Sequence, residues 1–301
     1  MFVLQSVSDR ERQKRNHLIR ASSMGNEDIK LYFETAIRLV KDAGKILLSA
    51  KKIHVEEKEP GDLVTEFDRK IEEVLINELK KKFPSHKFIG EEESFTKNKI
   101  NDLTDDPTWI VDPIDGTSNF VRKIPITCIS VGLVIKRERI IGIVYNPFHG
   151  ELYTAIRGEG AYLNGQRIHT SKKEDISRAC FNYELSLAKA EIYRAMYLTR
   201  LKYLIGEVEG IRSMGSAAMG LCYVARGYTD AYQCDGLYPW DAAAGVLIVE
   251  EAGGYVCEPT GMEFDLMKPD MLACATEKLA RQFLKIEKKA DEEWRLLLND
   301  L

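Results

Sequence analysis

The chain has 301 residues, of which 45% are hydrophobic and 30% charged, so it can bury a substantial core and is not a disordered polymer. Its formal charge is −4, and no stripe of lysine and arginine interleaved with aromatic residues occurs, which argues against nucleic acid as a partner. The six cysteines form no C-x-x-C pair. We therefore expect reduced thiols and neither a zinc ribbon nor a redox motif.

No apolar run approaches the ~20 residues of a membrane span, and the beginning of the chain lacks the layout of a secretory signal. We therefore expect a cytoplasmic protein with no membrane partner. Residues 1–25 are predicted to form a disordered extension. The basic residues and serines before Met24 also resemble a transit peptide, and this alternative stays open.

Two amphipathic helices are predicted first. Apolar residues recur at helical spacing over residues 27–50, and a second helical pattern begins after Thr65 and ends before Pro84. Pro60 and Gly61 indicate a turn between the two helices.

Short β-branched segments follow Pro84 and predict an antiparallel sheet that carries the two helices. They cover residues 109–112, 127–135, 140–145 and 151–156. Asn164-Gly165 predicts a tight hairpin turn of the primed type.

From about Ser177 onward strands and helices alternate, which is typical of α/β structure. We expect an apolar helix at residues 242–252 and a strand near residues 271–275. The predicted class is therefore mixed α/β (α+β). An N-terminal α+β half would span residues 26–176 and a C-terminal α/β half residues 177–301, and the two would pack closely.

The most informative acidic segment is W-I-V-D-P-I-D-G-T at residues 109–117. A buried strand presents Asp112, Pro113 prevents further strand pairing, and Asp115 follows three residues later. Magnesium takes hard oxygen ligands, so two converging carboxylates suit it. The amides of Gly116 and Thr117 could begin a helix and bind a phosphate. The alternative is that Asp-Pro and Asp-Gly are ordinary turn residues.

Three further acidic positions lie at predicted element boundaries. Glu91 follows the apolar pair Phe88-Ile89 and could point into a cleft, although acidic runs are commonly solvated surface. Asp68 lies three residues after Thr65, which also fits a capping box. Asp241 precedes an apolar helix, where it could be an N-cap, or a buried carboxylate that needs a charged partner or a metal.

Together these motifs resemble the inositol monophosphatase family over residues 27–280. The similarity rests on D-P-I-D-G-T at residues 112–117, W-D-A-A-A-G at 240–245 and E-A-G-G at 251–254. The resemblance implies a layered α-β-α-β-α fold, a homodimer and a magnesium-dependent, lithium-sensitive phosphatase. It also implies that the N-terminal half carries the metal site and that the C-terminal half completes it.

The resemblance further implies a role for each motif residue. Glu91, Asp112 and the carbonyl of Ile114 would bind one Mg²⁺; Asp112, Asp115 and Asp241 would bind a second, and Glu91 would contact a weakly held third. Thr117, hydrogen-bonded to Asp68, would help Glu91 to deprotonate the attacking water. The implied substrate-contacting residues are Glu91, Ile114, Asp115, Gly116, Thr117, Gly215, Ser216, Ala217, Cys234 and Asp241.

The chemistry of phosphate esters favours the same mechanism. A dianionic phosphate repels an anionic nucleophile unless cations neutralise its oxygens, and metal ions also acidify water, so no catalytic histidine is needed. The five histidines lie outside these motifs. Asp112 and Asp115 are three residues apart, whereas covalent aspartyl-phosphate enzymes normally space their acids by two. Direct attack by water is therefore preferred.

One position departs from the family pattern. Inositol-specific relatives usually have a glutamate where Cys234 stands, and a thiol is a weak substitute for that acceptor. Asp235 could replace it if the loop shifted. We therefore expect a hydrolase for inositol monophosphate, with another sugar or polyol phosphate, or 3′-phosphoadenosine 5′-phosphate, as alternatives. A non-catalytic scaffold is the third hypothesis.

Overall fold

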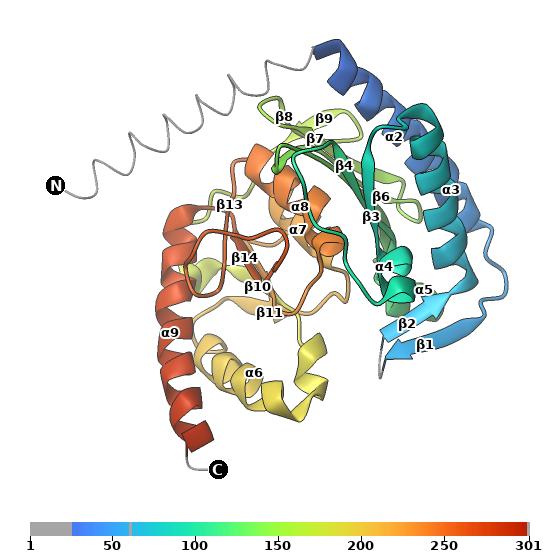
Figure 1. Ribbon diagram of the computed structural model, residues 1–301. Helices are drawn as coiled ribbons and strands as arrows, with labels where there is room; N and C mark the ends of the chain where they lie inside the picture. Colours follow the sequence, from blue (N-terminus) through green and yellow to red (C-terminus); the bar gives the residue numbers. More distant parts are fainter. Residues whose placement is uncertain (1–25, 60–61, 300–301) are drawn as a thin grey trace.

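The computed structural model describes residues 26–59 and 62–299. The extension predicted for residues 1–25 and the turn predicted at Pro60-Gly61 lie outside the described residues. Figure 1 shows helices and sheets stacked in alternating layers.

The first layer contains α2 (Asn26–Leu48) and α3 (Glu66–Lys82), as the helical periodicity predicts. Residues three or four apart on α2 form its buried face: Ala36, Leu39, Val40, Ala43 and Leu47. Between the helices, β1 (Val55–Glu59) and β2 (Asp62–Thr65) form an antiparallel pair. The sequence predicted only a turn there, because V-E-E-K-E has no apolar alternation.

The second layer is a seven-stranded sheet with the order β3-β4-β5-β6-β7-β8-β9. Its strands are β3 (Lys87–Gly90), β4 (Thr108–Asp115), β5 (Cys128–Ile135), β6 (Glu138–Asn146), β7 (Glu151–Ile156), β8 (Gly160–Leu163) and β9 (Gln166–Ile168). Asn164 and Gly165 both have positive φ, 50° and 79°, which confirms the predicted primed turn.

The prediction of a purely antiparallel sheet is wrong at one edge, because β3 pairs in parallel with β4. The short helix α4 (Glu91–Lys97) lies in the connection that returns the chain, and parallel neighbours require such a crossover. As a result, β3 and β4 both end at the same edge of the sheet.

The central layer contains α7 (Ala217–Ala225) and α8 (Pro239–Glu251). All of α7 and most of α8 are buried, because a sheet lies on either side. Gly132 of β5 and Gly142 of β6 allow α8 to approach closely. A Cβ atom at residue 142 would lie 2.6 Å from the carbonyl oxygen of Ala244.

A five-stranded sheet with the order β11-β10-β12-β14-β13 forms the fourth layer. Its strands are β10 (Cys180–Tyr183), β11 (Gly210–Arg212), β12 (Ala231–Cys234), β13 (Tyr255–Cys257) and β14 (Met271–Cys274). The helices α6 (Glu191–Leu204) and α9 (Glu277–Asn299) cover its outer face, far from α2 and α3 (Figure 1). This arrangement confirms the α-β-α-β-α fold.

Among residues 26–59 and 62–299, no helix combines the length and the apolar composition needed to cross a bilayer.

We expect Gly142→Ala to destabilise the protein by about 1–3 kcal/mol, because the added methyl group would overlap rigid backbone of α8. Urea unfolding measures the change. Gly206→Ala is the matched control, because a Cβ atom there meets nothing within 4 Å, and we expect a change within about 0.5 kcal/mol. Equal stability of the two variants would contradict the close packing of α8.

Candidate active site

The end of β4 brings two carboxylates to one place. Its pairing with β5 shifts register between Asp112 and Asp115, where Pro113 has no N–H to donate. The amide of Ile114 donates to Asp112 Oδ1 at 3.0 Å. Asp112 and Asp115 are both buried, so their charges lie in a region of weak solvent screening.

Asp241 reaches the same place from α8. The alternative that Asp241 is an N-cap is wrong, because Tyr238 is the N-cap, Pro239 begins the helix and Asp241 is its third residue. The amide of Tyr238 donates to Asp241 Oδ2 at 2.7 Å. Asp112, Asp115 and Asp241 each offer a carboxylate oxygen, and these oxygens all lie within 4.8 Å of one another.

Glu91 joins this group from the neighbouring strand. It follows β3 directly, begins α4 and is buried. Because β3 and β4 are parallel and end at the same edge, Glu91 forms a side-chain hydrogen bond with Asp112. Glu92 is also buried. The alternative of a solvated acidic run is therefore wrong for Glu91 and Glu92.

The carboxylate of Asp68 interacts with both Thr65 and Thr117. Its Oδ2 accepts from the amide of Thr65 at 2.7 Å, which completes the capping box of α3. Its Oδ1 lies 3.2 Å from the hydroxyl oxygen of Thr117. That hydroxyl is also 2.9 Å from the carbonyl oxygen of Ile114, so its single proton can be donated to either acceptor. The capping and site interpretations of Asp68 are thus compatible.

Gly116 has a positive φ of 83° and is the N-cap of α5 (Thr117–Arg122). A Cβ atom on Gly116 would lie 3.0 Å from the carbonyl oxygens of both Gly215 and Ile126. Only glycine suits this turn, because it needs both the left-handed conformation and the space.

The segment that contains Gly215, Ser216 and Ala217 lies beside Asp115. Ser216 is the N-cap of α7, and its hydroxyl donates to Asp115. The amides of Ala217 and Ala218 donate to Asp115 at 3.0 and 2.8 Å. Asp115 is therefore held at the positive end of α7, where a negative charge is favoured.

Two polar side chains that organise this region were missed. The amide group of Asn119 donates to the carbonyl oxygens of Ile126 and Met214, both at 2.8 Å. Glu184 accepts from the amides of Met214 and Gly215 at 2.7 and 3.0 Å. Neither lies in an acidic motif, and both bind segments distant in sequence, so the chain offered no local signal for them.

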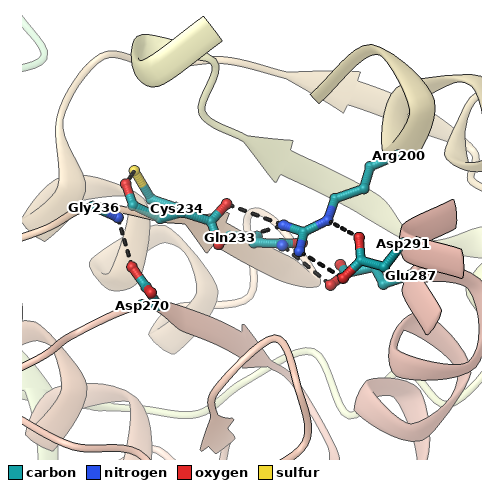
Figure 2. Close-up of polar contacts among 8 residues, drawn as sticks. Arg200, Gln233, Cys234, Gly236, Asp270, Glu287 and Asp291 are labelled. Carbon is teal, nitrogen blue, oxygen red and sulfur yellow. Dashed lines mark hydrogen bonds and ion pairs between the residues drawn. The ribbon is translucent and has the colours of Figure 1, made fainter. Parts of the chain in front are cut away.

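Cys234 ends β12 and packs with the central helices, whereas Asp235 faces the outer layer. Asp235 Oδ2 lies 3.2 Å from Arg200 of α6, and Arg200 also pairs with Asp291 of α9 at 2.8 Å. Figure 2 shows Arg200 next to Asp291, and the hydrogen bond that the amide of Gly236 donates to Asp270. Asp235 therefore forms an ion pair with Arg200 and does not replace Cys234 as a hydrogen-bond acceptor.

Burial raises the pKa of the Asp112 carboxyl well above its ordinary value, and the neighbouring charge of Glu91 raises it further. Burial also raises the pKa of Asp115, and it raises the pKa of Asp68 to about 7. Several carboxylates this close repel one another unless protons or cations balance them. Their hard oxygen donors, buried and convergent, fit a divalent cation such as Mg²⁺.

The layered fold and its buried acid cluster, together with the similarities below, define a phosphoric monoester hydrolase. The sequence profile of the inositol monophosphatase family matches residues 28–292. The chain belongs to this family of metal-dependent phosphatases.

Relatives from distant organisms are similar over most of the chain. Inositol monophosphatase 3 of Solanum lycopersicum is 43% identical over 244 residues, which cover 80% of this chain and 91% of that protein. Inositol monophosphatase 1 of Homo sapiens is 40% identical over 266 residues, covering 86% and 96%. The solved structure of an IMPase from Thermotoga maritima has a TM-score of 0.76 at 30% identity, covering 88% of this chain and 99% of that one.

We expect magnesium to stabilise the protein more at pH 8 than at pH 5.5. Between the ordinary carboxyl pKa near 4 and its raised pKa near 7, folded Asp68 keeps a proton that the unfolded chain has lost, and the raised pKa of Asp112 acts in the same direction, so stability without metal falls as pH rises. Magnesium binds the deprotonated cluster and offsets this loss. Thermal unfolding of chelator-treated protein with and without Mg²⁺ measures both effects. An equal rise in Tm at the two pH values would contradict the expectation.

Proposed function

We propose that this phosphatase hydrolyses inositol monophosphate to inositol and phosphate, with Mg²⁺ as cofactor and water as nucleophile. The observation that carries the proposal is the cluster of Asp112, Asp115 and Asp241, whose carboxylate oxygens lie within 4.8 Å of one another. The side chain of Glu91 is hydrogen-bonded to Asp112. The family resemblance and the names of the relatives, which are inositol monophosphatases, support the substrate.

The proposed metal ligands follow from the geometry and the family pattern. Glu91, Asp112 and the carbonyl oxygen of Ile114 would hold one Mg²⁺, while Asp112, Asp115 and Asp241 would hold a second. A third ion would bind weakly at Glu91. Bound Mg²⁺ supplies positive charge opposite the phosphoryl and leaving-group oxygens and makes the attacking water more acidic.

The chain's own groups position the reactants. Glu91 would accept the proton of the attacking water, and Thr117, in contact with Asp68 at 3.2 Å, would orient that water. The amides of Gly116 and Thr117 point out of the start of α5 and would bind the phosphate. Gly215, Ser216 and Ala217 would border the substrate ring.

The finer substrate preference depends on Cys234, which we propose faces the substrate. It is a weak hydrogen-bond acceptor, and the pairing of Asp235 with Arg200 removes the nearest replacement. Another sugar or polyol phosphate, or 3′-phosphoadenosine 5′-phosphate, is therefore the second candidate substrate. The complete acid set speaks against a non-catalytic scaffold.

The proposal extends to features implied by family membership. We propose a cytoplasmic homodimer that lithium inhibits. We also propose that residues 26–176 and 177–301 form two halves. The first contributes Glu91, Asp112 and Asp115, and the second contributes Asp241.

We expect Asp112→Asn to lower turnover roughly 1,000-fold. Asp112 is the proposed ligand of both Mg²⁺ ions, and these ions supply several kcal/mol of charge stabilisation to the transition state. Phosphate release with saturating Mg²⁺ measures the loss, and circular dichroism checks the fold. Asp102→Asn, which changes an exposed acid, is the matched control. Substantial magnesium-dependent activity in Asp112→Asn would refute the bridging role.

A phosphate-release screen over polyol, sugar and nucleotide phosphates, with and without lithium, tests the substrate. We expect Cys234→Glu to raise the use of inositol phosphate relative to the other substrates about tenfold, because one strong hydrogen bond to a ring hydroxyl is gained. Cys234→Ser is the matched control, since it adds no carboxylate. An unchanged substrate ratio in Cys234→Glu would exclude Cys234 as the selecting position.

A further inference from the structure

The amides that begin α4 are bound by a carboxylate from another helix. Glu72 of α3 is buried, and its two oxygens accept from the amides of Glu92 and Glu93, both at 2.8 Å. The N-cap of α4, Gly90, offers no side-chain hydrogen bond. Glu72 therefore provides the cap that the local sequence lacks.

Gly90 gives Glu72 the room to do this. A Cβ atom on residue 90 would lie 2.6 Å from the carboxyl carbon of Glu72. The φ of Gly90 is −110°, a conformation open to any residue, so glycine is required here for space rather than for backbone freedom. The close approach of α3 to the start of α4 is thus built into both segments.

The same face of α3 also reaches the start of α5. Asp68 and Glu72 are four residues apart, so they lie one above the other on the helix. Asp68 Oδ1 contacts the hydroxyl of Thr117, and Glu72 binds the two amides that follow Glu91. One rigid element therefore fixes the spacing between Thr117 and the first turn of α4.

We propose that Glu72 is a positioning residue for the hydrolytic reaction: it holds the first turn of α4 so that Glu91 lies correctly against Asp112 and Thr117. This inference rests on the proposed function, which gives Glu91 and Thr117 their roles in handling the attacking water. Glu72 itself contacts backbone amides and takes no part in proton transfer.

Glu72→Gln tests the proposal with almost no change of shape. The side-chain NH₂ group cannot accept from an amide, so one of the two hydrogen bonds is lost. We expect kcat to fall about 10- to 100-fold with KM for the phosphate substrate changed less than twofold, because a small displacement of Glu91 costs rate more than binding.

Two readouts do not depend on activity. In the metal-free protein, Mn²⁺ titrated by calorimetry should bind several-fold more weakly to Glu72→Gln, because a ligand has shifted. Hydrogen exchange of the amides of Glu92 and Glu93 should also accelerate. Glu73→Gln changes the exposed neighbour on α3 and should match the unmodified protein in all measurements.

Glu72→Asp, which keeps both acceptor oxygens on a shorter side chain, serves if Glu72→Gln does not fold, and the same losses are expected. A lower Tm with unchanged kcat and unchanged Mn²⁺ affinity would overturn the positioning role and leave only a structural one. Full activity of Glu91→Gln would instead refute the proposed role of Glu91, whatever Glu72→Gln does.

Discussion

Mutual repulsion among buried carboxylates is the constraint around which this protein is organised. The carboxylate oxygens of Asp112, Asp115 and Asp241 lie close enough to bind one ion, and Glu91 is hydrogen-bonded to Asp112. Such a group is unfavourable without cations, so the surrounding backbone must hold each acid in place. The acids do not cluster by attraction, and the elements that carry them supply the required stability.

Helix starts provide much of that support. Glu91 begins α4, Gly116 caps α5, Asp115 binds the first amides of α7, and Asp241 lies in the first turn of α8. Each helix carries a partial positive charge at this end. Four helix starts therefore surround the acid cluster and oppose its negative charge before any ion binds.

Local patterns in the sequence predicted the two N-terminal helices and several strands, and the family resemblance carried by the motifs implied the layered fold. The sequence could not predict the parallel pairing of β3 with β4, since partner choice is a long-range property. It placed the start of the apolar helix at residue 242, whereas the helix begins three residues earlier, at Pro239. Glu72 and Glu184 were not recognised, because they bind backbone amides far away in sequence. Glu251, part of a signature motif, instead binds the amides of Gly158 and Gly160 and so has a structural role.

Residues 239–240 and 242–249 of α8 are buried because the two sheets enclose the helix. It carries Asp241 toward the acids of β4 and is in close contact with Gly132 and Gly142. A helix enclosed in this way cannot act as a hinge, since any rotation would break contacts with both sheets at once. The position of Asp241 relative to the acids of β4 is therefore set by the packing of α8, and a substitution at Gly132 or Gly142 that displaces this helix would displace Asp241 with it.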